Sequence, residues 1–246
     1  MDINLAIDQG NSSAKVAFFH GEKLLGVSRY AALSPTDVEA ALSGKTIHRA
    51  IYSTVKEVDC EVTEALRRIA GDAVILDYLT PIPIDNAYAT PSTLGLDRLA
   101  AAVGAAFEAP GCNCLIIDAG TAVTLDVLTA DRRFLGGNIS PGLSMRFEAL
   151  HSHTSKLPLI DTGGEMPEIG YDTATAIRSG VAIGLTGEID SYIARMRRRF
   201  GNALRVFLTG GDSHLIASLS CSAEIIVDEN LLMKGLNRIL LYNEKI

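Results

Sequence analysis

Alternating apolar residues open the chain and predict a strand over residues 3–8 that ends at Asp8. A second apolar run at 16–19 follows, and a third strand is predicted near 23–28, after a turn at His20-Gly21. Short strands joined by tight turns are typical of an antiparallel meander. The pattern therefore predicts three neighbouring strands at the start of the chain.

Helical spacing then alternates with further strands. A short helix is predicted from Pro35 with Gly44 as its end, and a helix at 62–70 lies between predicted strands at 47–55 and 73–79. Residues 80–93 are rich in proline and predict a loop. Apolar residues next recur at helical spacing over 96–107, which predicts an amphipathic helix that ends near Pro110-Gly111.

The same order of elements begins again in the middle of the chain. Strands predicted at 115–118, 123–128 and 134–139 repeat the opening meander, and a helix follows Gly142. The longest helix is predicted over 173–200, a strand at 206–208 and a last helix at 229–242. We therefore expect an α/β fold of two similar domains, 1–112 and 113–246, with a cleft between them. The last helix is a candidate to pack back on the first domain.

Two strand exits share one chemical pattern, in which Asp-x-Gly precedes small hydroxyl residues. The first is Asp8-Gln9-Gly10-Asn11-Ser12-Ser13-Ala14-Lys15, and the second is Asp118-Ala119-Gly120-Thr121-Ala122. Glycine lets backbone N–H groups approach phosphate oxygens, and an aspartate at a strand end can hold a cation that neutralises them. One such turn is usually an ordinary Asx turn. Two copies indicate a duplicated nucleotide clamp, which suits phosphoryl transfer from ATP.

Other phosphate motifs are weaker. Ser43-Gly44-Lys45-Thr46 resembles the end of a Walker A loop, but Glu39 stands where the first glycine is required, so we reject a P-loop. Gly210-Gly211 follows a predicted strand and permits close approach of an adenosine to the backbone. Residues 136–142 form a glycine-rich loop before a helix start, which suits either turn geometry or contact with an anion.

The predicted helix start Gly95-Leu96-Asp97-Arg98 places an acidic residue next to a basic one. An aspartate in a first helical turn is commonly explained by capping. A helix start beside an arginine is also a receptor for a carboxylate, and an aspartate there can accept a proton from a substrate hydroxyl. The residues alone leave both interpretations open. His151 and His153 point in different directions on a helix, so we expect surface histidines rather than a metal site.

Composition and charge limit which binding partners and which cellular location we expect for the protein. Hydrophobic residues make up 48% of the 246 and the formal net charge is −7, which indicates a folded protein and disfavours nucleic acid or an anionic membrane as partner. Because the chain opens with Met1-Asp2 and the first predicted strand follows at once, and because it has no apolar stretch of ~18–20 residues, we expect neither a signal peptide nor a membrane helix, and a cytoplasmic protein. Its four cysteines are interpreted as reduced and buried.

The ordered motifs resemble those of the type III pantothenate kinases, the CoaX family in the superfamily of acetate kinase, sugar kinases and actin. The resemblance runs from end to end, and Ser12 stands where the family usually has threonine. Its motifs are Asp8-Gln9-Gly10-Asn11-Ser12, Tyr88 with Gly95-Leu96-Asp97-Arg98, Asp118-Ala119-Gly120-Thr121-Ala122, the loop 136–142, Lys156-Leu157-Pro158, Thr173 with Ser179-Gly180, Thr209-Gly210-Gly211 and Leu232 with Gly235-Leu236. The resemblance implies two actin/RNase H-like domains, each a mixed sheet flanked by helices, with ATP bound between them.

The resemblance also implies a reaction and residue roles. ATP with Mg²⁺ would phosphorylate pantothenate to 4′-phosphopantothenate, the first step of coenzyme A biosynthesis. Asp97 would accept the hydroxyl proton, and Arg98 would bind the pantothenate end or the migrating phosphoryl group. Tyr88 and Thr173, with Gly95 and Leu96, would line the substrate site. Residues 8–15 and Thr121 would bind ATP, and Asp118 would hold a potassium or ammonium ion.

The sequence also gives rise to expectations about how the protein assembles and which alternative functions it could have. The family forms homodimers, and the helix predicted over 173–200, which is apolar on several sides, is our candidate interface. A kinase or phosphatase for another small metabolite is the rival enzyme, and a regulatory or nucleotide-switch protein is the rival of another class. The intact Asp8, Asp97 and Asp118 weigh against a switch.

Overall fold

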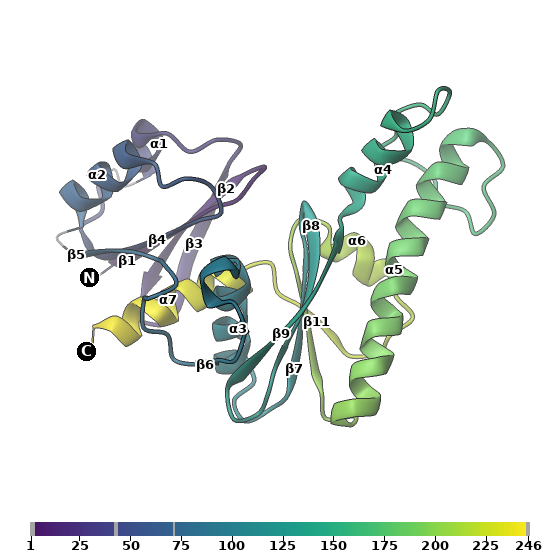
Figure 1. Ribbon diagram of the computed structural model, residues 1–246. Coiled ribbons are helices and arrows are strands. Elements are labelled where there is room, and N and C mark those ends of the chain that lie inside the picture. The colour runs from purple at the N-terminus through teal and green to yellow at the C-terminus, as the bar shows by residue number, and fades with distance from the viewer. Residues whose placement is uncertain (1–2, 42–43, 71, 245–246) are drawn as a thin grey trace. The chain divides into compact units, whose positions relative to one another are not determined.

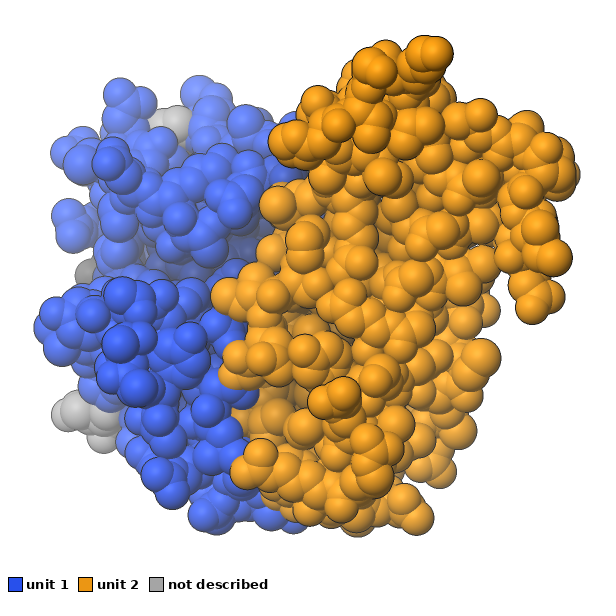
Figure 2. All heavy atoms as spheres, turned by 45° about the vertical axis from the view of Figure 1, so that its right-hand side comes forward, with its two compact units in different colours: residues 1–111, 128–136, 230–246 blue, residues 112–127, 137–229 orange. Residues whose placement is uncertain are grey.

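The computed structural model describes residues 3–41, 44–70 and 72–244, and it divides into two compact units, coloured separately in Figure 2. Unit 1 comprises residues 1–111, 128–136 and 230–246, and unit 2 comprises residues 112–127 and 137–229. The start of the chain and Ser43 of the rejected Walker-like sequence lie outside the described residues.

The elements of unit 1 come mainly from the first part of the chain (Figure 1). They are β1 (Ile3–Gln9), β2 (Ala14–His20), β3 (Lys23–Tyr30), α1 (Pro35–Ala41), β4 (Ile47–Thr54), α2 (Cys60–Ile69), β5 (Asp72–Ile75), β6 (Asp85–Asn86), η1 (Pro91–Thr93), α3 (Leu96–Glu108) and α7 (Leu231–Asn243). The others are β7 (Cys114–Ala119), β8 (Ala122–Leu128), β9 (Arg133–Pro141), α4 (Leu143–Ser152), α5 (Thr173–Phe200), β10 (Arg205–Thr209), α6 (Ser213–Leu219) and β11 (Ile225–Val227).

Unit 1 is built on a five-stranded sheet in the order β3-β2-β1-β4-β5. β1 pairs antiparallel with β2 and parallel with β4, and β4 pairs parallel with β5. Alternate residues of β1 explain its two covered faces. Leu5 and Ile7 join the core with residues of α1 and α2, whereas Asn4 faces α7 and donates a hydrogen bond to Asn237. Figure 1 shows α1 and α2 on one side of this sheet and α7 on the other.

The C-terminal helix α7 also packs closely on α3 within unit 1. Two glycines make this approach possible. A Cβ at Gly104 would overlap the carbonyl oxygen of Leu231, and a Cβ at Gly235 would overlap that of Ala100. The two helix backbones are therefore in direct contact, which side chains larger than glycine would prevent.

The sheet of unit 2 repeats the strand order of unit 1. Its first five strands are β11-β10-β7-β8-β9 in a six-stranded sheet that ends with β6, and β10 is parallel to both β7 and β11. The unit 1 part of β9 pairs with the short strand β6. If strands β1–β5 and strands β7–β11 are each numbered in chain order, both sets lie side by side in the order third, second, first, fourth, fifth. The repeat expected from the sequence is therefore present in the topology.

Helices α4, α5 and α6 supply the core of unit 2, with Leu143, Leu185 and Ile216 among the residues buried against the sheet. The predicted limits of α5 are confirmed. Asp172 and Thr175 form a capping box at its start, and Gly201 is the C-cap residue at its end. Basic residues occupy its last turn, as predicted for the negative end of the helix dipole.

Several predicted elements need correction. The strand expected over 73–79 ends at Ile75, because Asp77 accepts hydrogen bonds from the backbone N–H groups of Leu79 and Thr80 and forms a turn. The region 80–93, predicted as loop, contains β6 and η1. Helix α6 and strand β11 were not predicted, since each is too short to show a period.

The burial predicted for the cysteines is wrong for two of them. Cys60 and Cys221 are exposed, Cys112 is half-buried, and only Cys114 of the four is buried. Burial raises the pKa of the Cys114 thiol to about 12, so this thiol stays protonated. Among the described residues, every helix is too short or too polar to cross a bilayer.

Candidate active site

The first Asp-x-Gly turn joins β1 to β2 in unit 1. Asp8 lies opposite Lys15 in β2 and Ser53 in β4, at the carboxyl end of a parallel strand pair. The N–H of Gly10 donates to the carbonyl of Ser13 at 2.9 Å, which closes the turn. Residues 11–13 are exposed at its tip. The turn therefore presents backbone groups and hydroxyls beside a carboxylate, a suitable arrangement for phosphate.

The buried Tyr52 of β4 holds the side chain of Gln9, the residue that follows Asp8. The hydroxyl of Tyr52 donates to the Gln9 side-chain oxygen in a short hydrogen bond. Burial raises the pKa of Tyr52 above its usual 10, and a hydrogen bond with Thr54 opposes this rise with a smaller effect. A protonated Tyr52 keeps this donor in place, so Gln9 is positioned from inside the sheet rather than from solvent.

The predicted substrate residues of unit 1 come together at the start of α3. Asp97 lies in its first turn and accepts a hydrogen bond from the backbone N–H of Arg98 at 2.8 Å. The Arg98 side chain is buried, and its guanidinium lies 5.5 Å from the centre of the Tyr88 ring. Gly95 is the N-cap, and Leu96 is the first helical residue. An acid, a cation and an aromatic ring thus share one site in unit 1.

A glycine supports the tyrosine of this site. Gly136 has a φ of +91°, and a Cβ there would lie 2.7 Å from the Tyr88 ring. The ring also meets Phe134 at a centroid distance of 6.5 Å. Gly136, which lies within β9, therefore leaves room for the Tyr88 ring. Sequence reasoning identified the segment 136–142 but did not assign this contact.

The second Asp-x-Gly turn lies at the end of β7 in unit 2. Asp118 pairs in register with Thr209 of the adjacent parallel strand β10. Gly210 has a φ of +93°, and a Cβ there would lie 2.5 Å from an Asp118 carboxylate oxygen. Gly210 is thus required by the Asp118 turn itself, while Gly211 has open space around its Cα. Its predicted contact with adenosine stays a prediction.

Asp212 is a candidate that the sequence did not single out. Its backbone N–H donates to the carbonyl of Ala119 at 3.1 Å, so its position is tied to the Asp118 turn. Burial raises the pKa of its carboxyl group above 3.8. The signal available in the sequence was its place directly after Gly210-Gly211.

Residues 136–142, predicted as a glycine-rich loop, instead form the end of strand β9, which runs to Pro141, and the N-cap of α4 at Gly142, and this segment seats the second turn. The N–H of Gly142 donates to the carbonyl of Thr121 at 3.1 Å. A Cβ at Gly142 would lie 2.5 Å from that oxygen and closer still to the carbonyl of Gly120. Thr121 itself is exposed, as expected for a residue that contacts a ligand. The start of α4 and the Asp118 turn are therefore in backbone contact.

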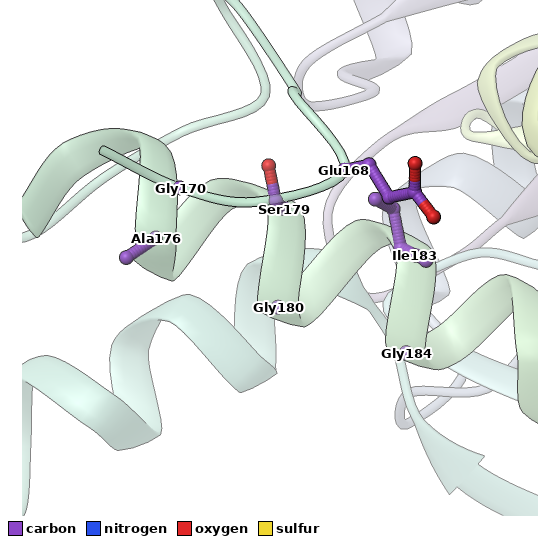
Figure 3. A pocket seen from close by; sticks show the side chains of 7 residues that line it. All are labelled: Glu168, Gly170, Ala176, Ser179, Gly180, Ile183 and Gly184. Carbon is purple, nitrogen blue, oxygen red and sulfur yellow. The ribbon is translucent and has the colours of Figure 1, made fainter. Parts of the chain in front are cut away.

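Thr173 begins α5 in unit 2 and borders a pocket of about 470 Å³, which Leu150 and Leu157 also line. A second pocket of about 280 Å³ lies farther along the same helix, where the segment with Glu168 and Gly170 faces Ala176 and Ser179 (Figure 3). Both pockets are apolar with a few polar groups, as small-molecule sites usually are. The helix that starts at Thr173 thus offers concave surface beside it.

The histidines and carboxylates bear on metal binding. His151 and His153 are exposed, as predicted, and a ring nitrogen of His151 lies 2.8 Å from the carbonyl of Leu157. Within the described residues, three or more His, Cys, Asp or Glu side chains do not gather into a metal site. Single carboxylates at Asp8 and Asp118 still fit Mg²⁺ or a monovalent ion, because such ions take most ligands from phosphate, water and backbone carbonyls.

Comparison with known proteins agrees with this chemistry. Residues 4–195 match the family model described as type III pantothenate kinase. The chain is 43% identical over 244 residues to a protein named type III pantothenate kinase from Phocaeicola vulgatus, with 99% of this chain and 100% of the relative covered. It is 42% identical over 246 residues to one of the same name from Porphyromonas gingivalis, covering 99% and 100%.

The fold is also found among solved structures. The activator of the 2-hydroxyisocaproyl-CoA dehydratase from Clostridium difficile, solved with bound ADPNP, is similar with a TM-score of 0.55 at 13% identity. The similarity covers 99% of this chain and 98% of that one. With the repeated strand order of the two units, this likeness confirms the predicted class of two actin/RNase H-like domains.

Proposed function

The chain belongs to the type III pantothenate kinase family, and from this premise we propose how its own residues carry out the reaction. The enzyme transfers a phosphoryl group from ATP to the hydroxyl of pantothenate and gives ADP and 4′-phosphopantothenate, the first step of coenzyme A biosynthesis. The observation that carries the residue assignments is the grouping of Tyr88, Asp97 and Arg98 at the start of α3.

Asp97 is the proposed general base. It takes the proton of the pantothenate hydroxyl as that oxygen bonds to the γ-phosphorus and the bond to ADP breaks. The bond from the Arg98 N–H fixes the carboxylate at the start of α3, where the helix dipole attracts negative charge. The capping and catalytic interpretations of Asp97 are therefore compatible, since the same geometry serves both.

Arg98 and Tyr88 are proposed to hold the substrate, with Gly95 and Leu96 shaping the helix start. The buried guanidinium is directed by the Tyr88 ring, so its charge is held in one orientation before the substrate arrives. A guanidinium recognises a carboxylate or a phosphoryl group through paired hydrogen bonds. This matches the carboxylate end of pantothenate or the migrating phosphoryl group.

The two turns are proposed to bind ATP phosphates. Residues 8–15 contribute amide groups, hydroxyls and the Lys15 charge, and Thr121 contributes its exposed hydroxyl. The expected cleft for ATP between the two halves stays a prediction. Asp8 is the proposed partner of the Mg²⁺–phosphate unit and Asp118 of a potassium or ammonium ion. Such cations supply charge neutralisation on the phosphates.

A homodimer is proposed with α5 as its interface. Small or apolar residues lie exposed along one face of this helix, namely Ala176, Gly180, Ile183, Gly184 and Gly187. A partner helix could approach closely there, because the glycines leave open space around their Cα atoms. Thr173 at the start of α5 would then place the pantothenate pocket beside the interface.

A reducing compartment suits the proposed enzyme. Cys60 and Cys221 carry exposed thiols, which persist unpaired where glutathione and thioredoxin keep thiols reduced. ATP and the proposed potassium ion are also available there. We therefore propose that the enzyme works in the cytoplasm.

The Asp97 assignment is tested by Asp97→Asn in an assay of ADP release with and without pantothenate. We expect kcat to fall by roughly 10²–10⁴-fold while ATP still binds, because only proton transfer is lost. Asp85→Asn is the matched control, an exposed aspartate of unit 1 outside the site. Thermal melting of both variants shows whether they are folded. A folded Asp97→Asn enzyme within about threefold of wild type would refute the assignment.

A further inference from the structure

An arginine of α4 and a glutamate of α5 are joined beside the second phosphate turn, and neither belongs to the residues assigned above. The terminal Nη2 of Arg146 donates to Glu188 Oε2 at 2.7 Å and to the Ser140 hydroxyl at 2.8 Å. Its Nε donates to the carbonyl of Pro141 at 2.8 Å. One guanidinium therefore binds α5 and the end of β9 at the same time.

The end of β9 held by this guanidinium leads directly into the residue that seats the second phosphate turn. Pro141 precedes Gly142, whose N–H donates to the carbonyl of Thr121 at 3.1 Å. Because Gly142 has no room for even a Cβ against residues 120 and 121, a movement of the end of β9 must move the turn. The Arg146 contacts at Ser140 and Pro141 thus act on Thr121 through the next residue, Gly142.

The charges of the pair strengthen this arrangement. Both side chains are only partly accessible, at 24% for Arg146 and 32% for Glu188. Burial alone would raise the pKa of Glu188, but hydrogen bonds from Ser140 and Arg146, with the charge of Arg146, lower it below 4.5. Glu188 is therefore ionised at neutral pH, and its bond to Arg146 is charge-assisted.

We propose that Arg146 and Glu188 are positioning residues that set the second phosphate turn for ATP. This proposal rests on the proposed role of Thr121 and Asp118 in binding ATP and its cation. A simple tie between α4 and α5 would need only the bond to Glu188. Two of the three Arg146 bonds instead go to residues 140 and 141, which points to control of the end of β9.

The test compares Arg146→Gln and Glu188→Gln in the full enzyme by steady-state kinetics with each substrate varied. For Arg146→Gln we expect kcat/KM for ATP to fall roughly 10-fold, as is usual when a group that orients a ligand-binding residue is lost. KM for pantothenate should change by less than about twofold. Glu188→Gln should have a smaller effect of about threefold, because its bonds are replaced by neutral ones.

Arg197→Gln is the matched control. Arg197 lies on α5 and also donates to a backbone carbonyl, that of Ala223, which is remote in sequence from the phosphate turn. It should leave both KM values within about twofold of wild type. If Arg146→Gln does not fold, Glu188→Gln and Arg146→Lys, which retain the size of the side chains, carry the test.

The outcomes separate this inference from the assignments it rests on. Thr121→Ala in the same assay must raise KM for ATP if the turn binds ATP, and no change would refute the turn assignment. If Thr121→Ala does raise it, an equal loss for both substrates in a folded Arg146→Gln enzyme would refute the positioning role. A selective loss for ATP that is not additive between Arg146→Gln and Glu188→Gln would support it.

Discussion

Replacing Gly142 with alanine tests how closely catalysis depends on the second phosphate turn. Gly142 has a φ of −72° and a ψ of 178°, which alanine adopts without strain, so the change is steric alone. The new Cβ would lie 2.5 Å from the Thr121 carbonyl oxygen, whereas ordinary contact begins at 3.4 Å. The turn must therefore retreat by about 1 Å, a misplacement that can cost on the order of 10²-fold in rate.

We expect Gly142→Ala to lower kcat/KM for ATP by roughly 100-fold and the free energy of unfolding by about 1–3 kcal/mol. The assay is coupled ADP release with ATP varied, beside thermal melting. Gly26→Ala is the control, because a Cβ at Gly26 meets nothing within 4 Å. A Gly142→Ala enzyme within about threefold of wild type would show that the turn does not need this position.

Two further predictions concern the cation and the assembly. Replacing potassium with sodium at fixed ionic strength should lower activity and ammonium should restore it, while Asp118→Asn should remove both the salt dependence and most activity; equal rates in all three salts would rule out a selective site. Ile183→Arg, at a side chain that is 40% exposed on α5, should weaken the dimer and the affinity for pantothenate together, because a charge buried without a partner costs several kcal/mol. Light scattering and pantothenate titration measure these effects, and a fully active wild-type monomer at assay concentration would contradict the prediction.

Local signals explain which elements the sequence predicts. The limits of α5 follow from residues next to each other in the chain, with Asp172 and Thr175 at its start and Gly201 after its end. Helix α6 spans only Ser213–Leu219 and strand β11 only Ile225–Val227, so neither shows a full period. The end of β5 depends on the hydrogen bonds that Asp77 accepts from Leu79 and Thr80. The apolar residues after Ile75 hide this turn in the sequence, because they continue the pattern of a strand.

The candidate site divides in the same way. Asp97 and Arg98 are adjacent in the chain, so their shared helix start is readable from the sequence. The contact of Gly210 with Asp118 and that of Arg146 with Glu188 join distant segments, and only folding brings them together. Repeated Asp-x-Gly turns indicate which residues can meet phosphate, but the groups that hold those turns in place carry no local pattern.

The place of α7 in unit 1 has a consequence for how the chain folds as it leaves the ribosome. Strand β1 is made first, yet the helix that covers one face of its sheet and packs on α3 through Gly104 and Gly235 is made last. All residues of unit 2 are synthesised before unit 1 can be completed. The central part of the chain can therefore reach its native contacts during synthesis, while the N-terminal sheet waits with one face uncovered until α7 has been synthesised.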